Sequence, residues 1–127
     1  MNKLRVGIAG YGIVGKRRRK FIDLNESMQT VAVCDIRFEG SGELEDGIRF
    51  YNNYKELLSD GLDVLFVCLT NDIASEVAVA GLRNGLHVFC EKPPGRNVQD
   101  VVNVRQEEEK HPHLKLMYGF NHRYHDS

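Results

Sequence analysis

The chain has 127 residues, of which 42% are apolar and 28% charged, a balance typical of one globular domain with its own hydrophobic core. Its 17 Lys and Arg against 18 Asp and Glu give a formal net charge of -1, which argues against a dedicated nucleic-acid binder, since such proteins carry a clear basic excess. No run approaches the roughly 18 consecutive apolar residues of a membrane span, and no signal peptide opens the sequence, so we expect a cytoplasmic protein with no membrane partner.

The predicted elements alternate between strands and helices. An apolar strand at 4–9 comes first, followed by a helix over about 12–24, a strand at 30–34 and a polar, glycine-rich loop at 36–47. A short helix at 54–58 precedes a strand at 63–69 and a helix that starts at 73 and ends at Asn84-Gly85. A strand at 87–90, a helix from 98 capped by Asn97, and a strand at 114–120 complete the order. This alternation predicts an α/β fold, a doubly wound, mostly parallel sheet with helices on both faces.

A glycine-rich turn follows the first strand and opens the first helix. Gly10, Gly12 and Gly15 form G-x-G-x-x-G, in which one glycine permits a tight turn, one lets a pyrophosphate approach the backbone, and one allows the helix to pack on the strand. The N-terminus of the helix then offers free N–H groups to the anion. We therefore expect a Rossmann-type dinucleotide site that includes the intervening residues Tyr11, Ile13 and Val14.

Asp35 strengthens this interpretation. It ends the second predicted strand, 20 residues after Gly15, where a carboxylate can hydrogen-bond both hydroxyls of an adenosine ribose. The alternative, glycines that only make a tight turn, does not explain an acid at this spacing. We expect Asp35 to favour NAD and the adjacent Ile36 and Arg37 to contact the cofactor, while Arg37 leaves a route to NADP.

Five consecutive basic residues, Lys16 to Lys20, follow the turn. On a helix they advance by about 100° each and encircle it, so they cannot all face one polyanion, and we expect no nucleic-acid partner. Lys16, Arg17, Arg19 and Lys20 should form a solvated face of the helix. The stem of Arg18 should lie over an apolar face made by Val14, Phe21 and Ile22, with its charged head in water.

No metal site is expected. Cys34, Cys68 and Cys90 have neither C-x-x-C spacing nor nearby histidine partners, and are most simply small buried apolar residues. His122 and His125 lack a third ligand at a suitable spacing.

A second motif, Glu91-Lys92-Pro93, directly follows the strand at 87–90, at the sheet edge where doubly wound folds bind ligands. Together, the glycine turn, Cys34-Asp35, the segment N-G-L-H-V-F-C-E-K-P and the following G-F-x-x-R resemble the N-terminal domain of the glucose-fructose oxidoreductase and inositol dehydrogenase family (Gfo/Idh/MocA). The resemblance covers nearly the whole chain. It implies that Lys92 reaches the reacting carbon near the nicotinamide, and that the peptide bond before Pro93 is cis.

The resemblance also implies further cofactor contacts at Leu69, Thr70 and Asn71, and at Glu91, Lys92 and Pro93. Here the family pattern T-P-N-x-x-H is altered, because Thr70 replaces the proline and Ala74 the histidine. Arg123 and Tyr124 are expected to approach the substrate.

Members of this family continue into a second domain that supplies the substrate pocket and the oligomer interface. We therefore expect residues 1–120 to form the dinucleotide-binding domain and residues 121–127 to begin the connection to a missing second domain, in a full-length protein that is a homo-oligomer.

Two functions remain open at this point. The first is the NAD-binding half of an oxidoreductase that transfers hydride between a secondary alcohol of a sugar, inositol or nucleotide-sugar and a nicotinamide, with Lys92 assisting proton removal. The second is a dinucleotide-sensing module without chemistry. The Glu-Lys-Pro motif favours the enzyme, and in both cases the chain alone should turn over little substrate.

Overall fold

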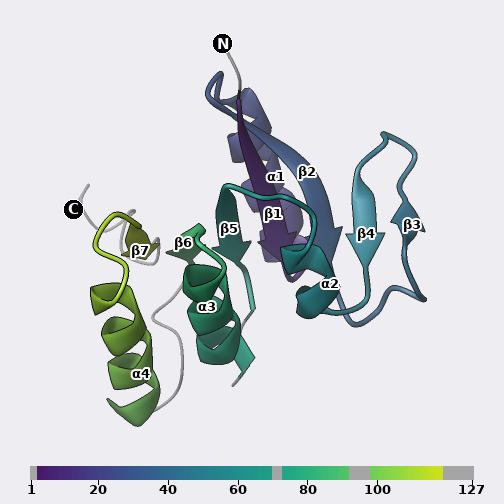
Figure 1. Cartoon of the computed structure of the whole chain (residues 1–127). Coiled ribbons are helices and arrows are strands. Elements are labelled where there is room, and N and C mark those ends of the chain that lie inside the picture. The colour runs from purple at the N-terminus through teal and green to yellow at the C-terminus, as the bar shows by residue number, and fades with distance from the viewer. Residues whose placement is uncertain (1–2, 70–72, 92–97, 119–127) are drawn as a thin grey trace, which may run out of the picture.

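The structure, a computed structural model, describes residues 3–69, 73–91 and 98–118. Seven strands form one sheet in the order β3-β4-β2-β1-β5-β6-β7 (Figure 1). The strands are β1 (Leu4–Ala9), β2 (Met28–Cys34), β3 (Gly42–Glu43), β4 (Arg49–Tyr51), β5 (Val64–Val67), β6 (His87–Cys90) and β7 (Leu116–Tyr118). All the described pairings are parallel except that of β3 with β4. The helices are α1 (Ile13–Leu24), α2 (Tyr54–Leu58), α3 (Ile73–Arg83) and α4 (Val98–Glu109).

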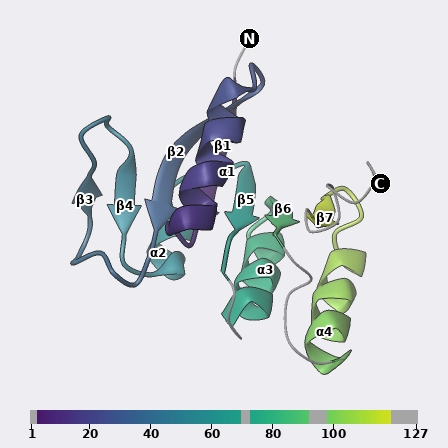
Figure 2. The ribbon, with the colours of Figure 1, turned by 180° about the vertical axis from the view of Figure 1, so that it is seen from behind.

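The helices cover both faces of the sheet. α2 and α3 lie on the near face in Figure 1, and α4 packs beside α3. α1 lies on the opposite face, as the view from behind makes clear (Figure 2). This division follows from right-handed crossovers between parallel strands. The connection through α1 leads from β1 to β2 on one side of β1, whereas the connections through α2, α3 and α4 lead to β5, β6 and β7 on its other side. Crossovers in opposite directions place their helices on opposite faces of the sheet. The predicted doubly wound architecture is confirmed.

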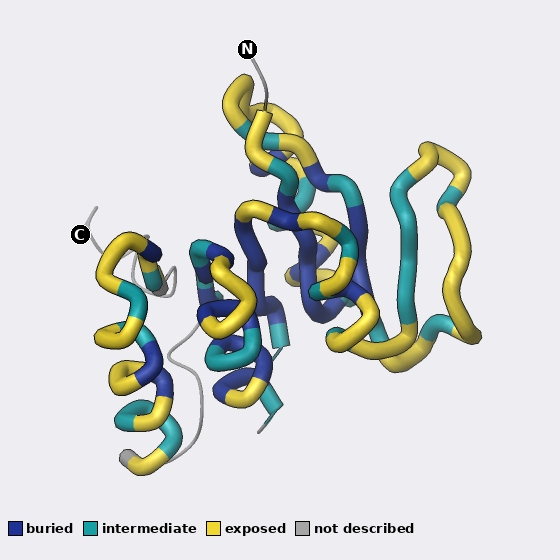
Figure 3. Tube along the Cα trace, viewed as in Figure 1, coloured by how far each residue is buried: buried dark blue, intermediate teal, exposed yellow. Residues whose placement is uncertain are grey.

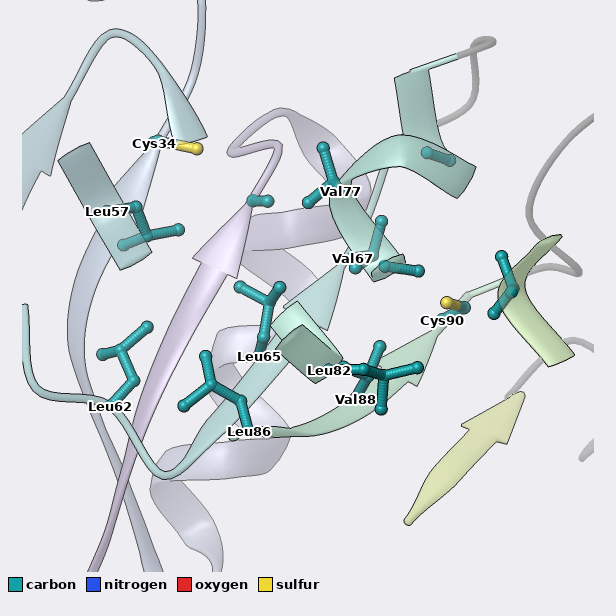
Figure 4. Packing of buried hydrophobic residues seen from close by; sticks show 14 of the residues in the cluster. Cys34, Leu57, Leu62, Leu65, Val67, Val77, Leu82, Leu86, Val88 and Cys90 are labelled. Carbon is teal, nitrogen blue, oxygen red and sulfur yellow. The ribbon is translucent and has the colours of Figure 1, made fainter. Parts of the chain in front are cut away.

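The core follows the two-residue period of the strands. Along β5, Leu65 and Val67 point to the helices α2 and α3, whereas Val64 and Phe66 point to α1. The larger cluster, on the side of α2, α3 and α4, is shown in Figure 4. Burial is concentrated in the central strands, while the loop between β2 and β4 is largely exposed (Figure 3).

The described residues cover the face that carries α1 only in part. A groove of about 510 Å³ lies beside α1 over β5, β6 and β7, and Phe21, Phe89 and Met117 are among its lining residues. Of the three residues expected to form the apolar face of α1, only Ile22 is buried; Val14 is 37% and Phe21 60% exposed. The apolar face of α1 is therefore only partly buried, and Phe21 lines the groove beside Ile22.

Most predicted elements are confirmed to within a few residues, and β1, α2 and β6 have the expected bounds. The loop expected at 36–47 contains no helix, but the strand β3 within it pairs with β4, and neither strand was expected from the sequence. The three cysteines are buried as expected, and burial raises the pKa of each thiol to about 12. In the described part of the chain, no helix is long and apolar enough to cross a membrane.

Candidate cofactor site

The residues that follow four parallel strands meet at one edge of the sheet. Backbone hydrogen bonds continue each pairing by one residue: Gly10 N–H donates to the carbonyl of Cys34 (2.9 Å), Cys68 N–H to that of Ala9 (2.8 Å), and Glu91 N–H to that of Val67 (3.1 Å). Asp35 N–H reaches the carbonyl of Tyr51 at 3.1 Å. The glycine turn, Asp35 and Glu91 therefore lie along the carboxyl edge, where doubly wound sheets bind ligands.

The three glycines of the turn differ in what a side chain would meet. Gly10 has a φ of 96°, and an added Cβ would lie 2.7 Å from the carbonyl oxygen of Cys68. A Cβ at Gly15 would lie 2.0 Å from the carbonyl oxygen of Gly10, so this glycine lets α1 pack against the end of β1. Among the residues that the structure describes, a Cβ at Gly12 would meet only the exposed guanidinium of Arg37 within 4 Å. The backbone is thus open at Gly12, as an approaching pyrophosphate requires.

The helix end at this turn is free to receive an anion. Gly12 is the N-cap of α1 and has no side chain with which to cap the helix, and the first turn of α1 contains no acidic residue. The N–H groups of a first turn have no partner within the helix, and the helix dipole places a partial positive charge there. Together with the opening at Gly12, this end of α1 suits the diphosphate of a dinucleotide.

Asp35 lies beside the turn and joins it to the end of β2. Its Oδ2 accepts a hydrogen bond from the backbone N–H of Tyr11 at 2.8 Å, inside the glycine motif. The side chain of Arg37 pairs with both carboxylate oxygens, and these bonds, with those from backbone N–H groups, hold the pKa of Asp35 well below its usual range. Asp35 is therefore ionised and fixed next to the turn.

Tyr11 is held from the other side by Arg19, which sequence reasoning placed on a solvated face. Arg19 Nη1 donates to the Tyr11 hydroxyl at 2.8 Å, and Arg19 also pairs with Asp23 on α1 and Asp46 in the loop between β3 and β4. Only 19% of its side chain is exposed, so the prediction was wrong for Arg19. The partner Asp46 is distant in sequence, and no local pattern indicated it.

Arg18 also differs from its prediction. Its guanidinium forms a salt bridge with Glu91, the first residue of the Glu-Lys-Pro motif, and lies 5.0 Å from the ring centre of Phe89. Both partners are largely buried, with 18% and 17% of their side chains exposed. Its charged head is therefore paired and not in water, and the pairing ties α1 to the end of β6.

The other predicted site residues divide between described and undescribed parts of the chain. Ile13 and Ile36 are exposed beside the turn and beside Asp35, and Leu69 lies close to Gly10. Thr70, Asn71, Lys92, Pro93, Arg123 and Tyr124 lie outside the described residues, as does the peptide bond expected to be cis. Within residues 3–69, 73–91 and 98–118, no group of three or more His, Cys, Asp or Glu could hold a metal ion.

Comparison with known families decides the assignment. The model of the oxidoreductase family with an NAD-binding Rossmann fold, GFO_IDH_MocA, matches residues 4–120. The chain belongs to this family. The match confirms the resemblance seen in the sequence and the predicted NAD-binding fold.

Several named bacterial proteins are similar to this chain in sequence. The chain is 32% identical over 127 residues to an inositol 2-dehydrogenase from Salmonella typhimurium and 30% identical over 125 residues to a myo-inositol 2-dehydrogenase from Thermotoga maritima. These alignments cover 95% of the chain but only 38% and 37% of the relatives. The chain thus spans well under half the length of these relatives.

Solved structures agree with this fold. A myo-inositol 2-dehydrogenase from Lactobacillus plantarum superposes with a TM-score of 0.82 at 25% identity, over 99% of this chain and 39% of that one. A scyllo-inositol dehydrogenase from Lactobacillus casei, solved with NAD(H) and scyllo-inositol, gives 0.81 at 20% identity, over 97% and 38% of the two chains. The second likeness supports the fold alone.

Proposed function

We propose that this chain is the cofactor-binding part of an oxidoreductase that transfers hydride between a secondary alcohol of a sugar, inositol or nucleotide-sugar and NAD. The observation that carries the proposal is the position of the Asp35 carboxylate, which accepts the Tyr11 N–H inside a glycine turn whose backbone is open at Gly12. A diphosphate at the turn and a ribose at Asp35 are the two contacts that distinguish a dinucleotide from a simple anion.

The proposed substrate class is inferred from the names of the similar proteins. Several are named inositol dehydrogenases, and one from Escherichia coli, 29% identical over 126 residues, is named D-glucoside 3-dehydrogenase. All these names denote oxidation of a polyhydroxylated ring. Because the chain covers 38% of the first of them, we propose that residues 1–120 form the cofactor domain and that residues 121–127 lead toward a substrate domain, in a homo-oligomeric protein.

Within this proposal the residues have separate roles. NAD, when bound, supplies the hydride acceptor. The glycine turn, with Tyr11, Ile13 and Val14, holds the diphosphate, and Asp35 with Ile36 and Arg37 receives the adenosine ribose. Residues 69–71 and 91–93 line the nicotinamide end, where Lys92 accepts the hydroxyl proton of the substrate as hydride leaves. Arg123 and Tyr124 approach the substrate.

A non-catalytic dinucleotide sensor is the second candidate. The glycine turn and Asp35 would suffice for it, and Lys92 would have no role. The salt bridge between Arg18 and Glu91 favours the enzyme, because it fixes the strand end that precedes Lys92 instead of leaving it free. A sensor that binds only the adenosine half of the dinucleotide does not require the end of β6 to be fixed in this way.

Replacing Lys92 separates the two candidates. In the chain extended through its natural reading frame, we expect Lys92→Met to keep NAD affinity within about threefold but to slow hydride transfer by roughly 10²- to 10⁴-fold, the range for a lost general base. Single-turnover absorbance of the nicotinamide, measured with a panel of sugars and inositols, provides the rate. Lys55→Met, on the exposed side of α2, is the control and should transfer hydride at the parental rate. Parental transfer by the Lys92 variant would refute the catalytic role.

A further inference from the structure

Arg19 directs the three nitrogens of its guanidinium to three different parts of the chain. Nε donates to Asp23 (3.2 Å) on α1, Nη1 to the hydroxyl of Tyr11 (2.8 Å) in the glycine turn, and Nη2 to Asp46 (2.5 Å) in the loop between β3 and β4. A guanidinium is planar, so bonds from all three nitrogens fix both its position and its orientation. Arg19 is therefore a fixed point beside the turn, with 19% of its side chain exposed.

The two acids that hold Arg19 are themselves bonded to the backbone. The second carboxylate oxygen of Asp23 accepts the N–H of Thr30 in β2 at 3.0 Å, and that of Asp46 accepts the N–H of Ile48 at 3.2 Å. The network thus joins β2, α1 and the loop before β4. The acids hold the arginine in place, and the arginine is the donor to the turn.

Tyr11 is held at both of its ends. Its backbone N–H donates to Asp35 at 2.8 Å, and its hydroxyl accepts the bond from Arg19. Gly10 and Gly12 flank it, and glycine restricts the backbone less than any other residue. The side chain of Tyr11 therefore provides a means of fixing this segment between its two glycines, and Arg19 holds the far end of that side chain.

The order of the turn bears on its affinity for a dinucleotide. A site that is formed before the ligand arrives loses little freedom on binding. A turn that adopts the binding conformation only part of the time has an apparent affinity reduced by that fraction. A group that keeps the turn ordered therefore contributes to affinity without touching the ligand.

We propose that Arg19 is a positioning residue of the cofactor site, which holds the glycine turn in its phosphate-binding conformation through the hydroxyl of Tyr11. It acts through Tyr11 and not as a phosphate ligand, because all three of its nitrogens are engaged within the protein. One member of the basic run thus serves the turn that precedes the run. This inference rests on the proposed function, because it assumes that the turn receives a diphosphate.

Calorimetric titration with NAD tests the proposal in three variants. Arg19→Met removes the donor, and Tyr11→Phe removes the acceptor but keeps the ring and the N–H bond to Asp35. We expect each to weaken NAD binding at least about fivefold, because the turn loses a bond to a charged group and is ordered less of the time. The double variant should bind NAD within about twofold of the weaker single variant, since both changes remove one interaction.

Arg17→Met is the matched control. Arg17 lies on the exposed side of the same helix, so the variant removes the same charge and should bind NAD within about twofold of the parental chain. Urea unfolding establishes that each variant is folded during the titration. Tyr11→Phe keeps both ion pairs of Arg19, so it tests the proposal even if Arg19→Met does not fold.

The other results of the titration are decisive as well. If Tyr11→Phe binds NAD as the parental chain does, or if the losses of the two single variants add in the double variant, Arg19 does not act through Tyr11. The inference is then wrong, while the proposed function stands. If the parental chain binds no NAD, the proposed function and the inference both fail.

Hydrogen exchange gives a readout that does not depend on affinity. Because the Tyr11 N–H is bonded to Asp35, we expect it to exchange at least about threefold faster in Arg19→Met and in Tyr11→Phe, while the amides of β1 keep the parental rate. A residue that only stabilised the fold would change the exchange in β1 as well. Equal acceleration in β1, or parental exchange at Tyr11, would overturn the inference.

Discussion

Gly12 and Gly15 belong to one motif, yet an added side chain should have different effects at the two positions. At Gly12 it should prevent cofactor binding, and at Gly15 it should lower the stability of the fold. Within the described part of the chain, an added Cβ at Gly12 meets only the Arg37 guanidinium, the far end of a flexible side chain, whereas at Gly15 it collides with the backbone carbonyl of Gly10. We expect Gly12→Val to abolish NAD binding while the chain stays folded, and Gly15→Ala to lower the free energy of unfolding by about 1–3 kcal/mol through overpacking. Urea unfolding and NAD titration of both variants provide the comparison. Outright unfolding of Gly12→Val, or normal NAD binding by it, would contradict the role given to the turn.

The ionisation of Asp35 links the candidate site to stability in acid. Hydrogen bonds from the Arg37 side chain, assisted by backbone N–H groups, outweigh partial burial and lower the pKa of Asp35. A carboxyl group with a lowered pKa in the folded state stabilises fully above its unfolded pKa, about 3.9, and loses this effect as pH falls toward the folded value. We expect the difference in unfolding free energy between the parental chain and Asp35→Asn to be constant from about pH 7 to pH 5 and to shrink below about pH 4. Urea unfolding across this range measures it, and a difference still constant at about pH 3 would show that Asp35 has no lowered pKa.

At the scale of elements, α1 is held to the sheet by a narrow contact. Ile22 is 1% exposed and Phe21, the next residue in the chain, is 60% exposed. We expect Ile22→Ala to cost about 2–5 kcal/mol of unfolding free energy, and Phe21→Ala to cost less than about 1 kcal/mol. Equal losses in urea unfolding would mean that Phe21 packs against part of the chain and that the groove beside α1 is closed.

The order of the elements was predictable because strands buried on both faces leave nearly continuous apolar runs, and because Gly85 and the glycine turn mark helix boundaries. The short strands β3 and β4 were not predictable, since β3 has two residues and lies within a polar, glycine-rich stretch. The exposure of Val14 and Phe21 was not predictable, because helical periodicity identifies apolar positions but does not indicate which of them a neighbouring element covers.

The candidate site was also predictable in part. Spacing alone placed Gly10, Gly12, Gly15 and Asp35 at one edge, and the structure brings them together. The salt bridge between Arg18 and Glu91 spans 73 positions and was not predictable, because no local pattern pairs one arginine of a basic run with a distant acid. The pairing of Arg37 with Asp35 is local, and their spacing could have indicated it.

At the scale of the whole molecule, the proposed function assigns to this chain the cofactor-binding part of a reaction site. The chain spans 38% of the length of its Salmonella relative, and its carboxyl edge carries the residues proposed to bind a dinucleotide. A cofactor site by itself does not exclude water or orient an alcohol for hydride transfer, so within the proposed function cofactor binding is the property that we expect of the chain itself.

Calorimetric titration of the chain with NAD and NADP tests this account most directly. We predict one NAD site per chain, tighter binding of NAD than of NADP, and a loss of about 1.5–3 kcal/mol of NAD affinity in Asp35→Ala, the range for a charge-assisted hydrogen bond. Asp63→Ala is the matched control, because Asp63 also accepts a backbone N–H, that of Arg5, but lies immediately before β5, away from the carboxyl edge. It should bind NAD as the parental chain does. Absence of NAD binding, or an Asp35→Ala variant that binds NAD with parental affinity, would contradict the account.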